Sequence, residues 1–117
     1  MKVIICGSRN GCPREQLEAA IKLSGFDITE VVEGGQAGVD TQAGRWADER
    51  GIDRVTFHAN WRKLGKAAGP LRNARMAAYA DACIALPGHK GTANMVETAR
   101  VAGLLIFDTL AQGRDRG

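Results

Sequence analysis

Short apolar runs and helical stripes alternate along the 117-residue chain. A run of four or five hydrophobic residues that ends at a glycine or a polar residue is typical of a strand buried on both faces. Apolar residues spaced three and four apart are typical of a helix that covers a sheet. The pattern predicts five strands, over residues 2–6, 28–33, 54–58, 82–86 and 104–108. It predicts helices over residues 13–24, 39–50, 70–80 and 92–102, and a long loop over residues 59–69.

Strands joined by helices imply parallel pairing, because each crossover returns the chain to the same edge of the sheet. We therefore predict an α/β fold, a Rossmann-like three-layer sandwich with a mostly parallel five-stranded sheet and helices on both faces. The length suits one domain, which we place over residues 1–108, followed by a polar C-terminal tail over residues 109–117. In such sheets ligands bind beyond the carboxyl ends of the strands, where the winding direction reverses.

Composition and charge exclude several classes of protein. The hydrophobic fraction of 44% and the charged fraction of 25% are ordinary for a globular protein and exclude a disordered or collagen-like chain. The longest apolar runs are too short to cross a bilayer, and the N-terminus leads directly into a strand rather than a signal peptide. We expect a cytoplasmic protein with no membrane partner. The net charge of +3, without a basic stripe, favours a small anionic ligand over nucleic acid.

Cysteine and histidine spacing predicts no metal site. The three cysteines contain no Cys-x-x-Cys pair, and the histidines lack metal-ligand spacing. Cys6 and Cys83 lie in apolar runs and are expected to be buried thiols, whereas Cys12 lies in a loop and should be accessible. We expect neither a metal nor a resident cofactor.

Four glycine-rich loops follow strands and should meet at the ligand edge of the sheet: GSRNGC, GGQAGVD, ANWRKLGKAAGP and PGHKGT. Glycines let backbone N–H groups approach phosphate oxygens, and helix N-termini add a favourable dipole. The predicted ligand-binding residues on these loops and on the helices after them are Gly7, Ser8, Arg9, Gly34, Gly35, Asp40, Lys66, Arg72, Asn73, Pro87, Gly88, Gly91, Thr92 and Asn94.

Several of these residues have a purely structural alternative. Ser8 and Thr92 suit ordinary helix N-caps, and Asp40 suits the first turn of a helix, where the dipole favours a carboxylate. Trp61 lies in the long loop and suits either stacking on a base or packing at an interface. The chain has no GxGxxG string, Walker A loop or Gly-x-Ser-x-Gly elbow. The residues alone therefore predict a protein that binds a small anion or nucleotide, and they do not identify a reaction.

Five strings are distributed along nearly the whole chain: GGQAGVD, FHANW, GKAAGPLRNARM, YADACIALPG and GTANMV. Together they resemble the YspA-like (YAcAr) family of the SLOG superfamily, which also includes the Lonely Guy phosphoribohydrolases and the Rossmann-like part of DprA. The GKAAGPLRNARM string is the most specific of them. The resemblance implies a Rossmann-like domain that binds nucleotides or nucleotide-derived molecules, often in bacterial or phage conflict systems. Because relatives commonly assemble, it also implies a homo-oligomer, a dimer or larger.

The same resemblance bears on catalysis. In Lonely Guy enzymes the motif PGGxGTxEE supplies a phosphate loop and a catalytic glutamate, and an arginine fifteen residues before its proline is also essential. Here Arg72 lies fifteen residues before Pro87, so the arginine is retained. Asn94 and Met95 occupy the glutamate positions, and neither an amide nor a thioether can activate water as a carboxylate does. Glu97 matches the lost position only if the helix start shifts.

Three functions follow from these observations. The first is a nucleotide-binding protein that acts as sensor, carrier or sequestering agent. Its phosphate would bind at the glycine loops and Thr92, with Arg72 and Lys66 as charge partners. Its ribose or base would bind at Asn73 and Asn94. The second is a hydrolase that cleaves the N-glycosidic bond of a nucleoside monophosphate, with Arg72, Glu97 and Asp40 as candidate catalytic residues. The third is single-stranded DNA binding, as in DprA, and the lack of a basic stripe argues against it.

Overall fold

The computed structural model of the protein describes residues 1–110, so most of the predicted tail lies outside the described residues. The strands are β1 (Lys2–Cys6), β2 (Glu30–Glu33), β3 (Asp53–Thr56), β4 (Ala82–Ala85) and β5 (Leu105–Asp108). The helices are α1 (Arg14–Ser24), α2 (Val39–Glu49), α3 (Trp61–Leu64), α4 (Ala68–Tyr79) and α5 (Lys90–Val101), with a 3₁₀ turn, η1 (Gly65–Ala67), between α3 and α4.

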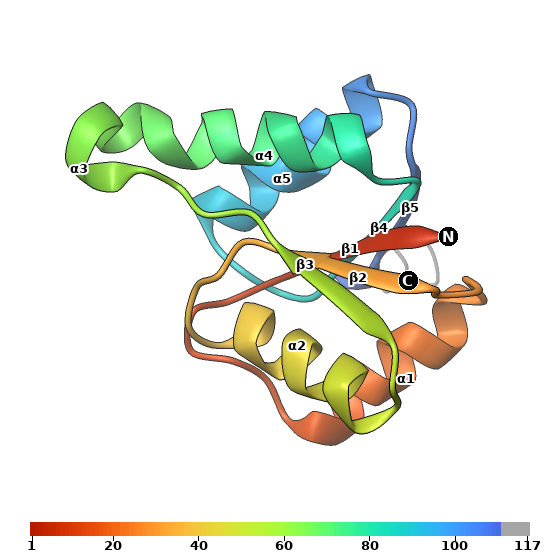
Figure 1. Ribbon diagram of the computed structural model, residues 1–117. Helices are drawn as coiled ribbons and strands as arrows, with labels where there is room; N and C mark the ends of the chain where they lie inside the picture. The colour runs from red at the N-terminus through yellow and green to blue at the C-terminus, as the bar shows by residue number, and fades with distance from the viewer. Residues whose placement is uncertain (111–117) are drawn as a thin grey trace.

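The five strands form one sheet in the order β3-β2-β1-β4-β5, and every neighbouring pair is parallel. Helices α1 and α2 cover one face, and α4 and α5 cover the other (Figure 1). This arrangement confirms the predicted Rossmann-like three-layer sandwich. The chain winds outward from β1 in one direction to β3 and then returns to place β4 on the other side of β1. The winding therefore reverses between β1 and β4.

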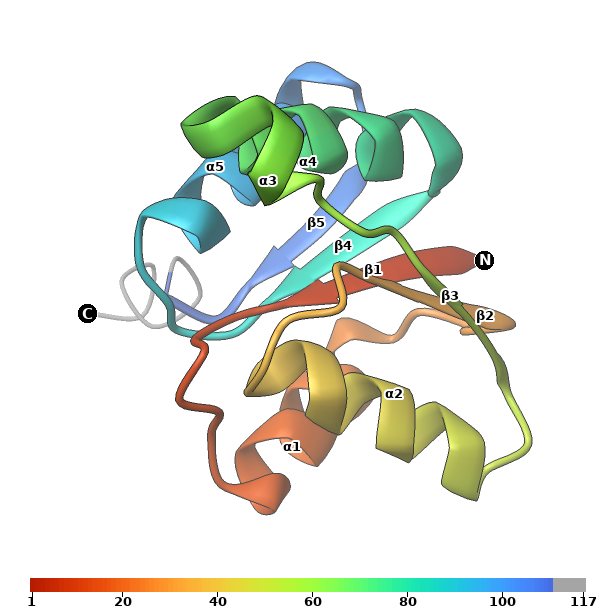
Figure 2. The same cartoon turned by 60° about the vertical axis from the view of Figure 1, so that its left-hand side comes forward.

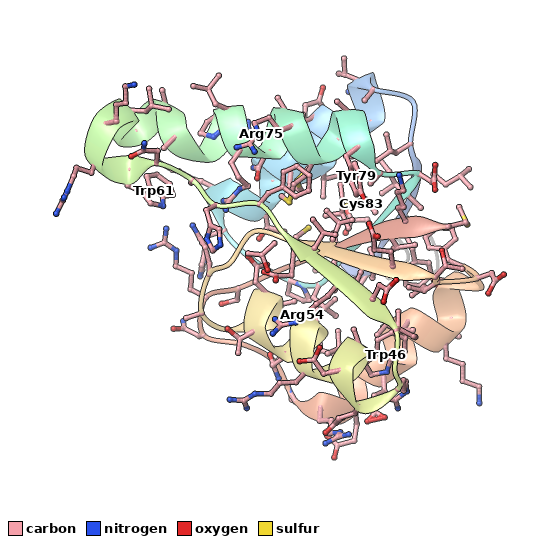
Figure 3. All side chains as sticks on the ribbon, viewed as in Figure 1. Trp46, Arg54, Trp61, Arg75, Tyr79 and Cys83 are labelled. Atoms are coloured by element: carbon pink, nitrogen blue, oxygen red, sulfur yellow. The ribbon has the colours of Figure 1, made fainter. Side chains whose placement is uncertain are left out.

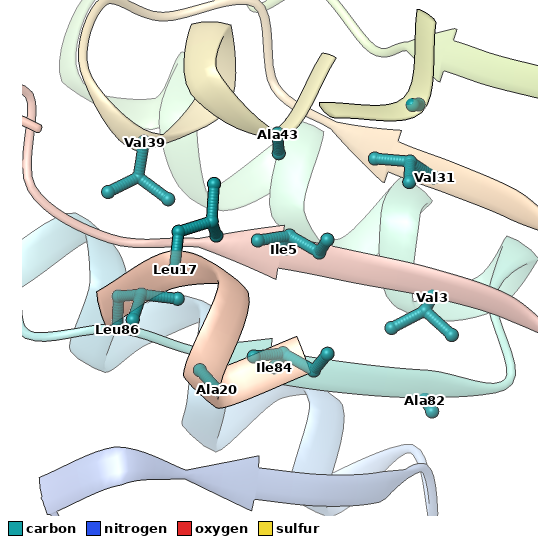
Figure 4. Packing of buried hydrophobic residues seen from close by; sticks show 11 residues of the cluster. Val3, Ile5, Leu17, Ala20, Val31, Val39, Ala43, Ala82, Ile84 and Leu86 are labelled. Atoms are coloured by element: carbon teal, nitrogen blue, oxygen red, sulfur yellow. The ribbon is translucent and has the colours of Figure 1, made fainter. Parts of the chain in front are cut away.

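Alternating side chains of the strands build two hydrophobic cores. Val3 and Ile5 of β1 face α1 and α2, in a cluster that also holds Leu17 and Ala43 (Figure 4). Ile4, one residue along, faces α4 and α5, with Met76 and Met95 among its neighbours in the second cluster. Because every strand residue of β1 after Lys2 is buried, its sequence is a continuous apolar run rather than an alternating one.

The predicted long loop over residues 59–69 is wrong, because the structure forms α3 and η1 there. The Asn60 side chain accepts a hydrogen bond from the Lys63 backbone N–H at 3.1 Å, which caps a four-residue helix. Helix α4 then begins at Ala68, two residues before Pro70. Proline is tolerated in this first turn because its missing N–H would have no partner within the helix. Arg72 and Asn73 consequently lie in the second turn rather than the first.

Helix α5 also begins earlier than predicted, at Lys90 instead of Thr92. The carbonyl of His89 accepts the Ala93 N–H at 3.0 Å, so the helix starts directly after a very short loop. Gly91 therefore lies in the first turn of α5 rather than in the loop. Thr92 occupies the third helical position and is not an N-cap.

The predicted burial of Cys6 and Cys83 is confirmed, whereas Cys12, which was expected to be accessible, is half-buried. The Sγ atoms of Cys6 and Cys83 are 4.0 Å apart. Within residues 1–110, no helix combines the length and apolar character needed to cross a bilayer.

Candidate functional site

A cavity of about 850 Å³ lies at the carboxyl ends of the strands, where the winding reverses. The loops after β1 and β4 meet there, because the Ser8 N–H donates a hydrogen bond to the Pro87 carbonyl at 3.0 Å. Helices α3 and α4 extend over the same edge, which Figure 2 brings toward the viewer. The cavity therefore occupies the position that doubly wound sheets use for ligands.

Most of the predicted ligand-binding residues line this cavity: Gly7, Ser8, Arg9, Asp40, Lys66, Arg72, Asn73, Gly91, Thr92 and Asn94. The structure places four others, Gly34, Gly35, Pro87 and Gly88, outside the lining. They lie in the adjoining loops, where the Gly34 backbone bonds Asp40 and Arg72 and the Pro87 carbonyl accepts the Ser8 N–H. Glu97 is also outside the lining, and its carboxylate pairs with Arg100 at 2.6 Å on the exposed surface of α5. Of the three candidate catalytic residues, only Arg72 and Asp40 reach the cavity.

Arg72 is a buried guanidinium, with only 7% of its surface accessible. Its Nη1 donates to the Gly34 carbonyl at 2.6 Å, and its Nε donates to Oδ1 of Asn73 at 2.9 Å. Within residues 1–110, no carboxylate lies within ion-pair distance of Arg72, and its Nη2 has no protein acceptor. Burial lowers its pKa, and the more distant charge of Asp40 partly offsets that effect. Arg72 thus places a positive charge at the cavity wall, and its Nη2 can donate a hydrogen bond to a ligand.

Asp40 is the carboxylate of the cavity. Its Oδ2 accepts backbone N–H groups of Gly34 and Gln36, each at 3.2 Å. Burial raises the pKa of Asp40 to about 6; the Gln36 hydrogen bond and Arg72 oppose the rise, whereas Glu33 adds to it. Asp40 therefore lies in the first turn of α2, as its structural alternative predicted, and lines the cavity as well.

A chain of hydrogen bonds orients two asparagines beside Arg72. Asn73 accepts from Arg72 through Oδ1, so its Nδ2 is a donor, and it donates to Oδ1 of Asn94 at 2.9 Å. The amide group of Asn94 then turns its own N–H donors away from Asn73. Asn94 occupies a position where Lonely Guy enzymes have a carboxylate. It is a neutral donor, and its orientation is set by Arg72 through Asn73.

The N-terminus of α5 borders the cavity with Lys90, Gly91 and Thr92. Within residues 1–110, no side chain caps this end of the helix, so the first N–H groups are available to a ligand. Gly88 makes room for the Thr92 hydroxyl, because a Cβ on Gly88 would lie 2.1 Å from Oγ1 of Thr92. Ser8 is not a helix cap either, because its hydroxyl accepts the Asn10 N–H at 3.0 Å within the β1–α1 loop.

Sequence reasoning missed Glu33, which is only 3% exposed at the end of β2. Its carboxylate accepts the Gly35 N–H at 2.5 Å and the Thr56 hydroxyl, and it lies 3.8 Å from Arg54. These contacts fix the turn at Gly34 and Gly35, and the Gly34 carbonyl accepts from Arg72. The sequence signal that could have identified Glu33 was a charged residue at the end of an apolar strand. Gln36 was missed as well; its Oε1 accepts Nε of Arg9 at 3.0 Å and joins two cavity loops.

The fold and the site define a class of protein, a Rossmann-like domain with a cationic crevice at the reversal of its sheet. The family model YAcAr, described as "YspA, cpYpsA-related SLOG family", matches residues 1–64. The chain belongs to this family. It is 33% identical over 119 aligned residues to the Gene 61 protein of Mycobacterium phage D29, and the alignment covers 92% of this chain and 94% of that protein.

A solved structure shares the fold. The X-ray structure of TM1055, a target of the Northeast Structural Genomics Consortium, superimposes with a TM-score of 0.67 and 21% sequence identity. The match covers 90% of this chain and 71% of TM1055. Among residues 1–110, no group of three or more histidine, cysteine or acidic side chains is arranged to hold a metal ion.

Proposed function

We propose that the protein binds a nucleotide or a nucleotide-derived ligand, with a phosphate group between the N-terminus of α5 and Arg72. The observation that carries this proposal is the buried Arg72 guanidinium, whose Nη2 has no acceptor among residues 1–110. A charge on a largely buried side chain is costly unless it is paired. Nη2 is still accessible, because no buried side-chain nitrogen or oxygen of the described residues lacks a hydrogen-bond partner. An anionic oxygen in the cavity would supply the missing partner, and guanidinium binds phosphate with particular geometric specificity.

The charge and size of the cavity support the same ligand class. Among the described residues, Arg9, Lys66, Arg72 and Lys90 line it, against the single carboxylate of Asp40. Its volume of about 850 Å³ lies toward the upper end of the usual range for small-molecule sites, which is roughly 300–1,000 Å³. A phosphate alone would leave most of this space empty, so the proposed ligand carries a sugar and a base.

The proposed role is that of a sensor, carrier or sequestering protein rather than a Lonely Guy-type hydrolase. Asn94 and Met95 replace the carboxylates of that reaction, and Glu97 is exposed and paired with Arg100. The similarity to a phage protein supports a phage setting for this role. Binding of single-stranded DNA is disfavoured, because the sequence has no basic stripe that could follow a strand.

The test is a thermal-shift screen with nucleoside mono- and diphosphates, ADP-ribose and dinucleotides, followed by calorimetric titration of any ligand that raises the melting temperature. We expect Arg72→Ala to abolish the shift. Arg75→Ala is the matched control, because it removes the same charge from an exposed side chain of the same helix that does not line the cavity. Thr92→Val is a second binding variant that leaves the buried arginine intact. An unchanged melting temperature across the whole panel, or equal binding by Arg72→Ala and Arg75→Ala, would refute the proposal.

One observation favours a second candidate function, the hydrolysis of an N-glycosidic bond with Asp40 as acid or base. A carboxyl group whose pKa is raised to about 6 in a cavity is suited to proton transfer near neutral pH. Incubation with nucleoside monophosphates and chromatography for free base test this function. Release of base that Asp40→Asn abolishes would support it, and intact substrates after prolonged incubation would exclude it.

A further inference from the structure

Trp61 is an exposed aromatic side chain in the wall of the cavity. It is 44% exposed, and it belongs to a set of large hydrophobic residues that are exposed within residues 1–110. The other members of that set are all aliphatic, and none of them lines this cavity. Figure 3 shows Trp61 beneath α3, on the side of the sheet opposite Trp46. Trp61 thus differs from an ordinary exposed hydrophobic residue in both its chemistry and its place.

The chain holds this indole in a fixed position. Asn60 caps α3 through the Lys63 N–H, and Gly65 ends α3 with a φ of 56°. The turn brings the indole against the first turn of α4, where a Cβ on Gly69 would lie 2.9 Å from the Cη2 atom of Trp61. Only a glycine at position 69 lets the ring pack this closely on the helix. One part of the indole is therefore fixed by α4, while the rest remains open.

The indole lies one helical turn from the residues that bind the proposed phosphate. Gly69, which the indole contacts, precedes Arg72 and Asn73 on α4 by three and four residues, a rise of about 4.5–6 Å. Asn94, on the neighbouring helix α5, accepts a hydrogen bond from Asn73. The cavity therefore has an aromatic end at Trp61, a cationic end at Arg72 and α5, and neutral amides beside the cationic end.

We propose that Trp61 forms a nucleobase subsite, in which the base of the ligand stacks on the indole while its phosphate binds at Arg72 and α5. This inference rests on the proposed function and deepens it, because it names the ligand as one with an aromatic ring joined to phosphate through a sugar. Every nucleobase has a π-face, so stacking alone tolerates different bases. Purines should bind more tightly than pyrimidines, because their larger rings make more contacts with the indole.

The test compares a nucleoside monophosphate with ribose 5-phosphate, which lacks the base. Trp61→Ala should weaken binding of the nucleotide about 5- to 150-fold, as is usual for loss of base–aromatic stacking. It should leave the affinity for ribose 5-phosphate unchanged, whereas Arg72→Ala should weaken both. Trp61→Phe should recover most of the lost affinity. In a Trp46→Phe background, Trp61 is the remaining tryptophan, and the nucleotide should quench its fluorescence while ribose 5-phosphate should not.

The possible failures are distinguishable. If wild-type protein binds the nucleotide and Trp61→Ala binds it equally well, the base subsite is refuted and the proposed function stands. If neither ligand binds to wild-type protein, the proposed function fails and this inference fails with it. If Trp61→Ala changes the mass measured by light scattering but not the nucleotide affinity, Trp61 is an interface residue and the base subsite is again refuted.

Discussion

Asp40→Asn should make the protein more stable at neutral pH, although it alters the candidate site. Burial raises the pKa of Asp40 from 3.8 to about 6, so the folded state favours the protonated carboxyl group. Asp40 ionises near pH 4 in the unfolded chain and only near pH 6 in the folded protein. Stability is therefore lost as the pH rises through this window and stays low above it. A rise of about two pKa units corresponds to at most ~3 kcal/mol of unfolding free energy at pH 7.5.

The asparagine variant should recover this energy because it is neutral at every pH and keeps an acceptor oxygen. That oxygen can still accept the N–H groups of Gly34 and Gln36, which now bond to Oδ2 of Asp40. We expect Asp40→Asn to exceed the wild-type protein by up to ~3 kcal/mol at pH 7.5, and the difference to shrink toward zero near pH 4.

Urea unfolding followed by circular dichroism, at half-unit steps from pH 4 to pH 8, measures this difference. Asp53→Asn is the matched control, since it removes the same charge from an exposed position on β3 and should change stability little. A variant that is destabilised equally at pH 4.5 and pH 7.5 would refute the reasoning. That result would mean that the ionised carboxylate stabilises the fold through Arg72, and that burial is not the dominant effect.

Three further substitutions probe the site and the loops behind it. Gly88→Ala should weaken ligand binding roughly tenfold, about 1.4 kcal/mol, because the new Cβ displaces the Thr92 hydroxyl; calorimetric titration measures the loss. Asn94→Asp should also weaken binding of a phosphate ligand, because it adds a negative charge near the proposed phosphate, and the loss should become smaller in high salt. Gly38→Ala should destabilise the fold by more than ~2 kcal/mol in urea, since its φ is 79° and its Cβ would lie 2.2 Å from a backbone oxygen of the β1–α1 loop. Gly25→Ala has a similar φ but open space around it, so it should cost only about 1 kcal/mol.

The sequence predicted the sheet well because a parallel sheet buries its strands on both faces. Continuous apolar runs such as residues 3–6 and Ala82–Ala85 therefore identify strands without tertiary information. The long loop was mispredicted because a four-residue helix has too few residues to show a period. Its formation depends on the Asn60 cap and on the packing of Trp61 against α4, and neither is visible as a pattern.

The lining of the candidate cavity was predicted where it depended on topology and missed where it depended on contacts. Glycine loops after strands identified the edge of the sheet at which the cavity lies, and the family resemblance singled out Arg72, which lines it. The binding role of these residues stays a prediction. The role of Glu33 depends on two groups that are far from it in the sequence and reach it only when the chain folds, Thr56 and Arg54. The homo-oligomer and the cytoplasmic location stay predictions, as does the binding of any particular nucleotide.

The division of the helices between the two faces of the sheet has a consequence for how the chain folds. Residues 1–64 contain β1, β2, β3 and the two helices of one face, but neither long helix of the other. A nascent chain of that length would leave Ile4 and Val32 uncovered, because Met76, Met95 and their neighbours have not yet emerged. We therefore expect the isolated segment 1–64 to aggregate rather than fold. During synthesis, the domain should reach its native structure only after α5 and β5 have emerged and closed the second core.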